Sequence, residues 1–230
     1  MISKARLFCL LAVLSLGIST AVFAHGGDIG LNLENGRLTA GLIGEDDYEN
    51  EYFDANTWVF GSELDYGETL IGKWASNEPG VESYGNLTTN SSIRLDFLDS
   101  LLLWNGSGVD LADQTLTVSY AGLGSTTTYT GPVHGFNIPI DATGYLHKHL
   151  SFAINGADEN DSAIYILKGQ FVSDADGTSN PFAIVFNMNA TEEDHDAAIT
   201  WAQANAVPEP ASTLALGAGL VGLLGFKRRR

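Results

Sequence analysis

Residues 25–190 alternate between short apolar, β-branched runs and breaks rich in Gly, Asn and Asp. No 3.6-residue period extends through this stretch, so the pattern predicts many short strands rather than helices. Asn35-Gly36 separates two such runs and is typical of a tight hairpin turn. Strands without helices between them pair antiparallel. We therefore expect an all-β fold, an antiparallel β-sandwich with jelly-roll or immunoglobulin-like topology. Predicted strands cover residues 28–33, 37–42, 57–60, 92–98, 101–104, 114–120, 126–129, 135–140, 146–154, 162–171 and 182–188.

One short helix is predicted near the end of this region. Thr191 can cap its N-terminus, with Asp194 three residues later as a short capping box. Glu192 and Glu193 suit the positive end of the helix dipole. An apolar stripe should dock this helix on the sandwich, and it consists of Ala198, Ile199, Trp201 and Ala202.

The N-terminus has the pattern of a secretory signal peptide. Two basic residues precede an apolar run, and small residues stand at Val22 and Ala24, the −3 and −1 positions of a cleavage site. We expect residues 1–24 to be removed by signal peptidase. Cys9 is the single cysteine and lies inside this segment. The exported chain therefore lacks the thiols that disulfides, Cys₄ zinc sites and cysteine nucleophiles require.

The C-terminus has three parts in a fixed order. Pro208-Glu209-Pro210 is followed by an uncharged stretch, residues 211–226, and then by a basic cluster. Sixteen helical residues span ~24 Å, somewhat less than a ~30 Å hydrocarbon core. The basic cluster should stay on the cytoplasmic side of a membrane. It consists of Lys227, Arg228, Arg229 and Arg230.

This tail resembles the PEP-CTERM sorting signal of bacterial envelope proteins. The resemblance implies that an exosortase recognises the tail and usually removes it, so membrane anchoring by a C-terminal transmembrane helix is transient or retained. It also implies delivery to the cell envelope, the surface or the extracellular matrix. The chain is then divided into a signal peptide, an exported β-sandwich domain and a sorting or anchor segment, at residues 1–24, 25–206 and 207–230.

The exported domain is strongly acidic. The whole chain has a formal charge of −17, and residues 25–206 contain five basic and 27 acidic residues, a charge of −22. Such a surface repels phosphates, which argues against nucleic acid binding. It attracts cations and keeps an exported protein soluble.

Two histidines form a His-x-His pair within the predicted strand 146–154. Because side chains alternate along a strand, His147 and His149 should project from the same face, about 6–7 Å apart at the backbone. Imidazoles at this spacing can converge on one ion with Zn–N distances of ~2.0–2.1 Å. The alternative is an ordinary pair of surface imidazoles on the polar face of a strand.

His25 and Asp28 add a histidine and a carboxylate near the start of the exported domain. The order His-x-x-Asp-Ile, Glu34-Asn35-Gly36-Arg37-Leu38 and a Gly-x-x-His-x-His strand running into Phe152-Ala153-Ile154-Asn155-Gly156 resembles choice-of-anchor M surface domains. It is also similar to Zur-regulated PEP-CTERM surface proteins linked to zinc supply. Leu146 stands where these proteins commonly have an aromatic residue.

The resemblance implies a metal site, most simply for zinc, formed by His25, Asp28, His147 and His149. Asp28 is expected either as a ligand or as an acceptor that orients a ring. His134 and His195 are weaker candidates for extra ligands. Imidazole and carboxylate ligands would also accept Cu²⁺. Metal binding should weaken as pH falls through ~6.5, where imidazoles in general protonate.

Calcium is a poor candidate. Asp174-x-Asp176-Gly177 resembles the front of a calcium loop, but Val185 occupies the position that needs a bidentate Glu. The acidic run at residues 45–51 has no fixed ligand spacing.

Three functions stay open at this stage. The leading one is zinc capture or buffering at the cell surface, without enzymatic activity. A structural or adhesive matrix protein, in contact with exopolysaccharide and without any metal, fits the sorting tail equally well. The third is a copper-dependent oxidative enzyme in which the free amine and ring of His25 join another histidine.

Overall fold

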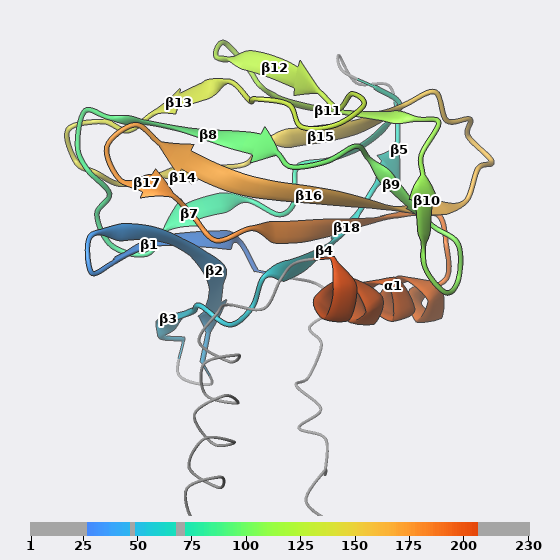
Figure 1. Ribbon diagram of the computed structural model, residues 1–230, viewed down its shortest axis with the longest axis horizontal. Helices are drawn as coiled ribbons and strands as arrows, with labels where there is room; N and C mark the ends of the chain where they lie inside the picture. Colours follow the sequence, from blue (N-terminus) through green and yellow to red (C-terminus); the bar gives the residue numbers. More distant parts are fainter. Residues whose placement is uncertain (1–26, 47–48, 68–71, 207–230) are drawn as a thin grey trace, which may run out of the picture.

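The computed structural model describes residues 27–46, 49–67 and 72–206. The predicted signal peptide, His25 and the predicted membrane segment lie outside these residues. The described chain forms strands in three sheets around a shared core, together with one helix (Figure 1). This sandwich-like arrangement confirms the all-β class.

The largest sheet is built around β16 (Ala163–Ser173), which pairs with β18 (Phe182–Met188) over seven residues. On its other side β16 pairs with β8 (Ser92–Phe97) and β9 (Leu102–Trp104). The remaining strands of this sheet are β4 (Val59–Glu63), β10 (Val109–Leu111), β13 (Asn137–Pro139) and β17 (Gly177–Thr178).

The second sheet has the order β14-β7-β1-β2-β3. The β1–β2 hairpin turns at Asn35 and Gly36, whose φ values of 53° and 75° confirm the predicted turn. The bounds are β1 (Ile29–Glu34), β2 (Arg37–Glu45), β3 (Glu51–Asp54), β7 (Val81–Ser83) and β14 (His147–Lys148).

The third sheet has the order β12-β11-β15-β6-β5. Its bounds are β5 (Asp65–Tyr66), β6 (Trp74–Ser76), β11 (Thr115–Tyr120), β12 (Gly124–Thr127) and β15 (Ser151–Asn155). The predicted strand at 146–154 is therefore wrong as one element. It divides into β14 and β15, which belong to different sheets, because the chain leaves one sheet after Lys148 and enters the other at Ser151.

The pairing is antiparallel except at two places. β18 pairs parallel with β4, and β1 pairs parallel with β7. The expectation of antiparallel pairing throughout is wrong there. β4 and β18 are the first and last strands of their sheet along the chain, and β7 rejoins β1 after the chain has passed through both other sheets. The pattern also missed β3, β5, β6, β7, β10 and β17, all of which have four residues or fewer and show little alternation.

All seven residues of β18 are buried, because the strand is covered on both faces. On one face Phe186 packs against Phe152 of the third sheet, with ring centroids 5.3 Å apart. On the other face Val185 packs beneath the helix with Ala198 and Ile199. Burial on both faces explains why the strand is a continuous apolar run instead of an alternating one.

The helix α1 (Glu192–Asn205) forms as predicted. The hydroxyl of its N-cap, Thr191, accepts a hydrogen bond of 3.2 Å from the Asp194 amide. Ala198, Ile199 and Ala202 are buried against the sheet, and Trp201 tilts against Trp104 at 5.7 Å between centroids. Within the described ranges no helix is both long enough and apolar enough to span a bilayer.

Truncation of Phe186 should test the shared core. We expect Phe186→Ala to lower the free energy of unfolding by about 3–5 kcal/mol, because it leaves a cavity between two sheets. Urea unfolding of the full chain measures the effect. Tyr129→Ala, at a side chain that is 77% exposed, should change it by less than about 0.5 kcal/mol. Equal midpoints for the two variants would contradict a core shared by the sheets.

Candidate metal centre

The rings of His147 and His149 face one another at the surface of the molecule. Their Nε2 atoms lie 3.1 Å apart, and the ring centroids are 5.1 Å apart. His147 begins β14, and His149 follows in the segment that leads to β15. The two side chains are 42% and 43% exposed, so an ion can reach both from solvent.

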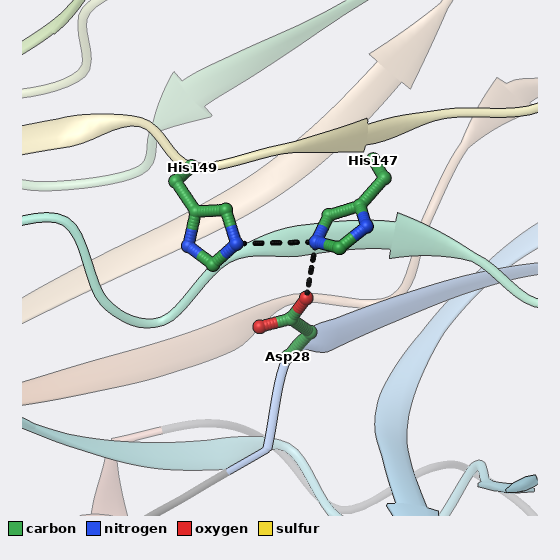
Figure 2. Close-up of side chains that lie close together, drawn as sticks. All are labelled: Asp28, His147 and His149. Carbon is green, nitrogen blue, oxygen red and sulfur yellow. Dashed lines mark hydrogen bonds and ion pairs between the residues drawn. The ribbon is translucent and has the colours of Figure 1, made fainter.

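Asp28 completes a three-residue cluster from a distant part of the sequence. It directly precedes β1, and its Oδ2 lies 3.3 Å from His147 Nε2 (Figure 2). One ligand atom from each of the three residues lies within 4.8 Å of the others. Asp28 therefore lies within reach of both imidazoles, and its expected role as a ligand or as an acceptor that orients a ring stays a prediction.

Strand β7 brings these residues together. Val81 pairs with Ile29 on the parallel side and with Lys148 on the antiparallel side. The amide of Ile29 also donates to the carbonyl of Gly80, at 2.9 Å. Because neighbouring strands lie ~4.8 Å apart, one strand between β1 and β14 leaves the side chains of Asp28 and His147 within reach of each other.

The outer nitrogen of each ring faces an oxygen acceptor. His147 Nδ1 lies 3.7 Å from Glu82 Oε1 and 3.4 Å from the Tyr145 hydroxyl. His149 Nδ1 lies 3.2 Å from Glu78 Oε1 and 3.3 Å from the carbonyl oxygen of Asn77. Such partners favour protons on Nδ1 and leave lone pairs on Nε2.

The resulting arrangement places three electron-rich atoms around one point. With Nδ1 protonated on both rings, the two Nε2 lone pairs and the Asp28 carboxylate face each other without a donor between them. A tetrahedral ion with ligand distances of 2.0–2.1 Å has ligand–ligand edges of about 3.3 Å. The Nε2–Nε2 distance of 3.1 Å and the Nε2–Oδ2 distance of 3.3 Å match two such edges.

Gly80 makes room for the Asp28 carboxylate. A Cβ at residue 80 would lie 2.5 Å from Asp28 Oδ1 and 2.8 Å from Cγ. Any larger residue there would displace the carboxylate from the imidazoles. The same loop provides Glu78, whose Oε2 accepts a 3.0 Å hydrogen bond from the Gly80 amide.

A cleft of about 330 Å³ opens beside the cluster. Asp28 of the cluster and Glu82, which faces His147, both line it, and Glu45, Glu51 and Tyr52 are among the other lining residues. Four carboxylates along one cleft concentrate cations next to the imidazoles.

The two weaker candidate ligands, His134 and His195, lie elsewhere, and His25 is outside the described residues. His134 is 82% exposed, and its Nδ1 lies 2.9 Å from Asp96, which also binds Arg94. His195 belongs to the first turn of α1 and is fully buried, with Glu63 and Glu192 beside it. The structure therefore places neither at the Asp28 cluster.

The carboxylates of the calcium-like stretch at Asp174 and Asp176 accept hydrogen bonds from backbone amides of the chain. Asp174 accepts from the Ser92 amide at 2.8 Å, and Asp176 accepts from the Thr88 amide at 3.3 Å.

Sequence reasoning missed Glu78 and Glu82. Both lie in or next to β7, which is too short to show a period. The only available signal was their spacing around Pro79-Gly80, and that spacing has no meaning until β7 is placed beside β14.

Residues 206–230 match the family model of the PEP-CTERM protein-sorting motif. The chain carries a PEP-CTERM sorting signal. This confirms the predicted tail, including Pro208-Glu209-Pro210, which lies outside the described residues. No curated protein matched the chain.

The signal indicates export to the cell envelope or surface and makes an exosortase the partner of this PEP-CTERM protein. Ala206, the first residue of the motif, is also the C-cap of α1, and its amide donates to the Ala202 carbonyl at 2.8 Å. The sorting tail therefore leaves directly from the helix. The resemblance of the exported domain to choice-of-anchor M proteins stays a prediction.

Burial is the main cause that raises the pKa of Asp28 above its usual value. Glu78 and Glu82 raise it further, whereas His149 and His147 lower it. The metal-free site thus disfavours the carboxylate that a cation would stabilise. The hydrogen bond from Tyr145 to Glu82 raises the pKa of the phenol to about 12, so Tyr145 stays a neutral donor.

Replacing Asp28 should show whether its carboxylate stabilises the metal-free fold. The pKa of Asp28 is higher in the folded protein than the value near 3.8 expected in the unfolded chain. Such a carboxyl stabilises the fold at pH values below 3.8, and this stabilisation is lost as pH rises through the pKa of the folded state. At pH 8 with chelator, Asp28→Asn should therefore melt at or up to about 3 °C above the wild type. At pH 3.5 the difference should vanish.

Asp113→Asn, at an exposed position, is the matched control for this melting experiment. A clear loss of stability in metal-free Asp28→Asn would show that the carboxylate stabilises the apo fold.

Gly80→Ala should weaken metal binding without touching a ligand. The added methyl displaces the Asp28 carboxylate, and we expect a 10- to 100-fold loss of Zn²⁺ affinity in a competition titration. Gly67→Ala is the control, because an added Cβ there meets nothing within 4 Å. Equal affinities for the two variants would argue against Asp28 as a ligand.

Proposed function

We propose that this PEP-CTERM protein captures or buffers Zn²⁺ at the bacterial envelope through Asp28, His147 and His149. The observation that carries the proposal is the convergence of two Nε2 atoms and a carboxylate oxygen, all within 4.8 Å of one another. Two imidazoles and a carboxylate form a ligand set that zinc accepts readily.

The surroundings of the cluster support a metal over an ordinary surface pair. Each imidazole has a carboxylate behind it, Glu82 for His147 and Glu78 for His149. Carboxylates in this position fix the tautomer and raise the basicity of a metal-binding ring. Ordinary surface imidazoles on the polar face of a strand need no carboxylate partners.

The access route also suits a cation. The ligands are partly exposed, and the neighbouring cleft contributes Glu45 and Glu51 to the local negative charge. With the charge of −22 on residues 25–206, the field draws divalent cations toward the site. An open site of this kind suits reversible capture, since a buried structural zinc would be enclosed by four protein ligands.

His25 is the proposed fourth ligand. It lies outside the described residues, and only three peptide units separate it from Asp28. Covalent geometry keeps the two Cα atoms within about 11 Å of each other. A water molecule in the fourth position would serve equally well for buffering.

Zinc titration of the full-length chain in detergent tests the proposal. We expect His147→Gln/His149→Gln to bind one equivalent less Zn²⁺ than the wild type, because both nitrogen ligands are lost. His134→Gln, at an exposed histidine outside the cluster, should bind as the wild type does.

Equal zinc binding by the double variant and the His134→Gln control would reject the site and favour a structural or adhesive role. A second comparison is Cu²⁺ titration after removal of residues 1–24, which frees the amine of residue 25, with and without His25→Ala. A loss confined to copper would favour the copper-dependent alternative over zinc buffering.

A further inference from the structure

A second group of ligand atoms surrounds His195 in the first turn of α1. The ring is fully buried, and its Nε2 lies 3.0 Å from the carbonyl oxygen of Val185 in β18. A carbonyl oxygen only accepts hydrogen bonds, so Nε2 carries the proton in this contact. In the neutral ring, Nδ1 therefore carries a lone pair and no hydrogen.

Two carboxylates share the space in front of this lone pair. Glu63, the last residue of β4, places Oε1 at 3.2 Å from His195 Nδ1. Glu192, one turn earlier on the helix, offers a second carboxylate, and the three ligand atoms lie within 4.8 Å of one another. Nevertheless, Nδ1 makes no hydrogen bond within the part of the chain that the structure describes.

This geometry differs from that of a simple ion pair. In a simple ion pair, the N–H bond of a protonated Nδ1 points at the carboxylate oxygen and forms a hydrogen bond at such a distance. Here the oxygen is close but lies off the direction of the ring lone pair. A separation near 3.3 Å between two ligand atoms is what a shared tetrahedral ion at about 2.1 Å from each produces.

We propose that Glu63, Glu192 and His195 form a second site for a divalent transition metal, independent of the Asp28 cluster. The buried Nδ1, which makes no hydrogen bond among the described residues and lies beside two carboxylates, carries this inference. One imidazole and two carboxylates form a mixed ligand set that Zn²⁺ accepts. Glu63 and Glu192 are partly or fully exposed, which leaves the ion a path from solvent.

Local structure explains how the three residues meet. Glu192 and His195 stand three positions apart and share one face of α1. Glu63 reaches them through the parallel register in which it lies opposite Asn187. The Asn187 side-chain amide donates to Glu63 Oε1 at 3.2 Å and so orients the carboxylate. Three acidic residues in the first turn outweigh the positive helix dipole, which would otherwise repel a cation.

An ion at this site would connect α1 to the edge strand β4. The helix touches β4, β16 and β18, and it lies well apart from β14 and β7 in Figure 1. Because the sorting motif begins at the C-cap of α1, metal binding here would stabilise the segment from which the tail leaves.

The test uses the full-length chain with His147→Gln/His149→Gln as background, so that the first site is silent. We expect this background protein to retain one equivalent of Zn²⁺ and to melt at a higher temperature when zinc is added. Adding Glu192→Gln should reduce zinc affinity at least 10-fold and abolish the zinc-dependent shift. Glu193→Gln removes the same charge from the next exposed residue outside the cluster and should preserve both.

Two outcomes would overturn the second site: a background protein that takes up no zinc, or identical zinc binding by the Glu192→Gln and Glu193→Gln proteins. Either result would leave His195 as a buried imidazole or an imidazolium paired with Glu63. Failure of the Asp28 site is recognised separately. In that case the wild type and the His147→Gln/His149→Gln protein bind the same amount of zinc, while Glu192→Gln still reduces it.

Discussion

The candidate site depends on the backbone pairing of one short strand. β7 has three residues, and it pairs with β1 on one side and with β14 on the other. Through it the start of the exported domain lies beside a segment more than a hundred residues later. Neither Asp28 nor the histidines could meet without this strand, and the adjoining loop supplies Glu78 and the space left by Gly80.

Electrostatics then determine what such a site can hold. The two imidazoles pair with Asp28, Glu78 and Glu82, and among the described residues no Lys or Arg forms an ion pair with these carboxylates. The carboxylates behind the rings favour lone pairs on the inner nitrogens, and burial raises the pKa of the inner carboxyl. A cation bound there, as proposed above, would relieve both effects.

Both clusters occur at places where a parallel strand joins a sheet. β7 joins β1 next to Asp28, and β4 joins β18 next to His195. At each place the chain arrives from a distant segment and adds carboxylates to a histidine that has a fixed second contact. The sorting signal directs the chain to the cell envelope or surface, where the two proposed sites would meet metal ions.

The sequence by itself determined the class of fold, most of the longer strands, the cap of the helix and the sorting tail. These follow from local rules: alternation along a strand, the Asn35-Gly36 turn, the Thr191 cap and the order of the C-terminal residues. It also indicated His147, His149 and Asp28 as candidates, through strand period and resemblance. The tertiary structure alone decided that β14 and β15 separate, that β7 lies between β1 and β14, and that Glu78 and Glu82 stand behind the rings. Strands of two or three residues have no detectable period, and their partners are chosen by hydrogen bonding and burial across the whole domain, so these contacts could not be predicted from any local pattern.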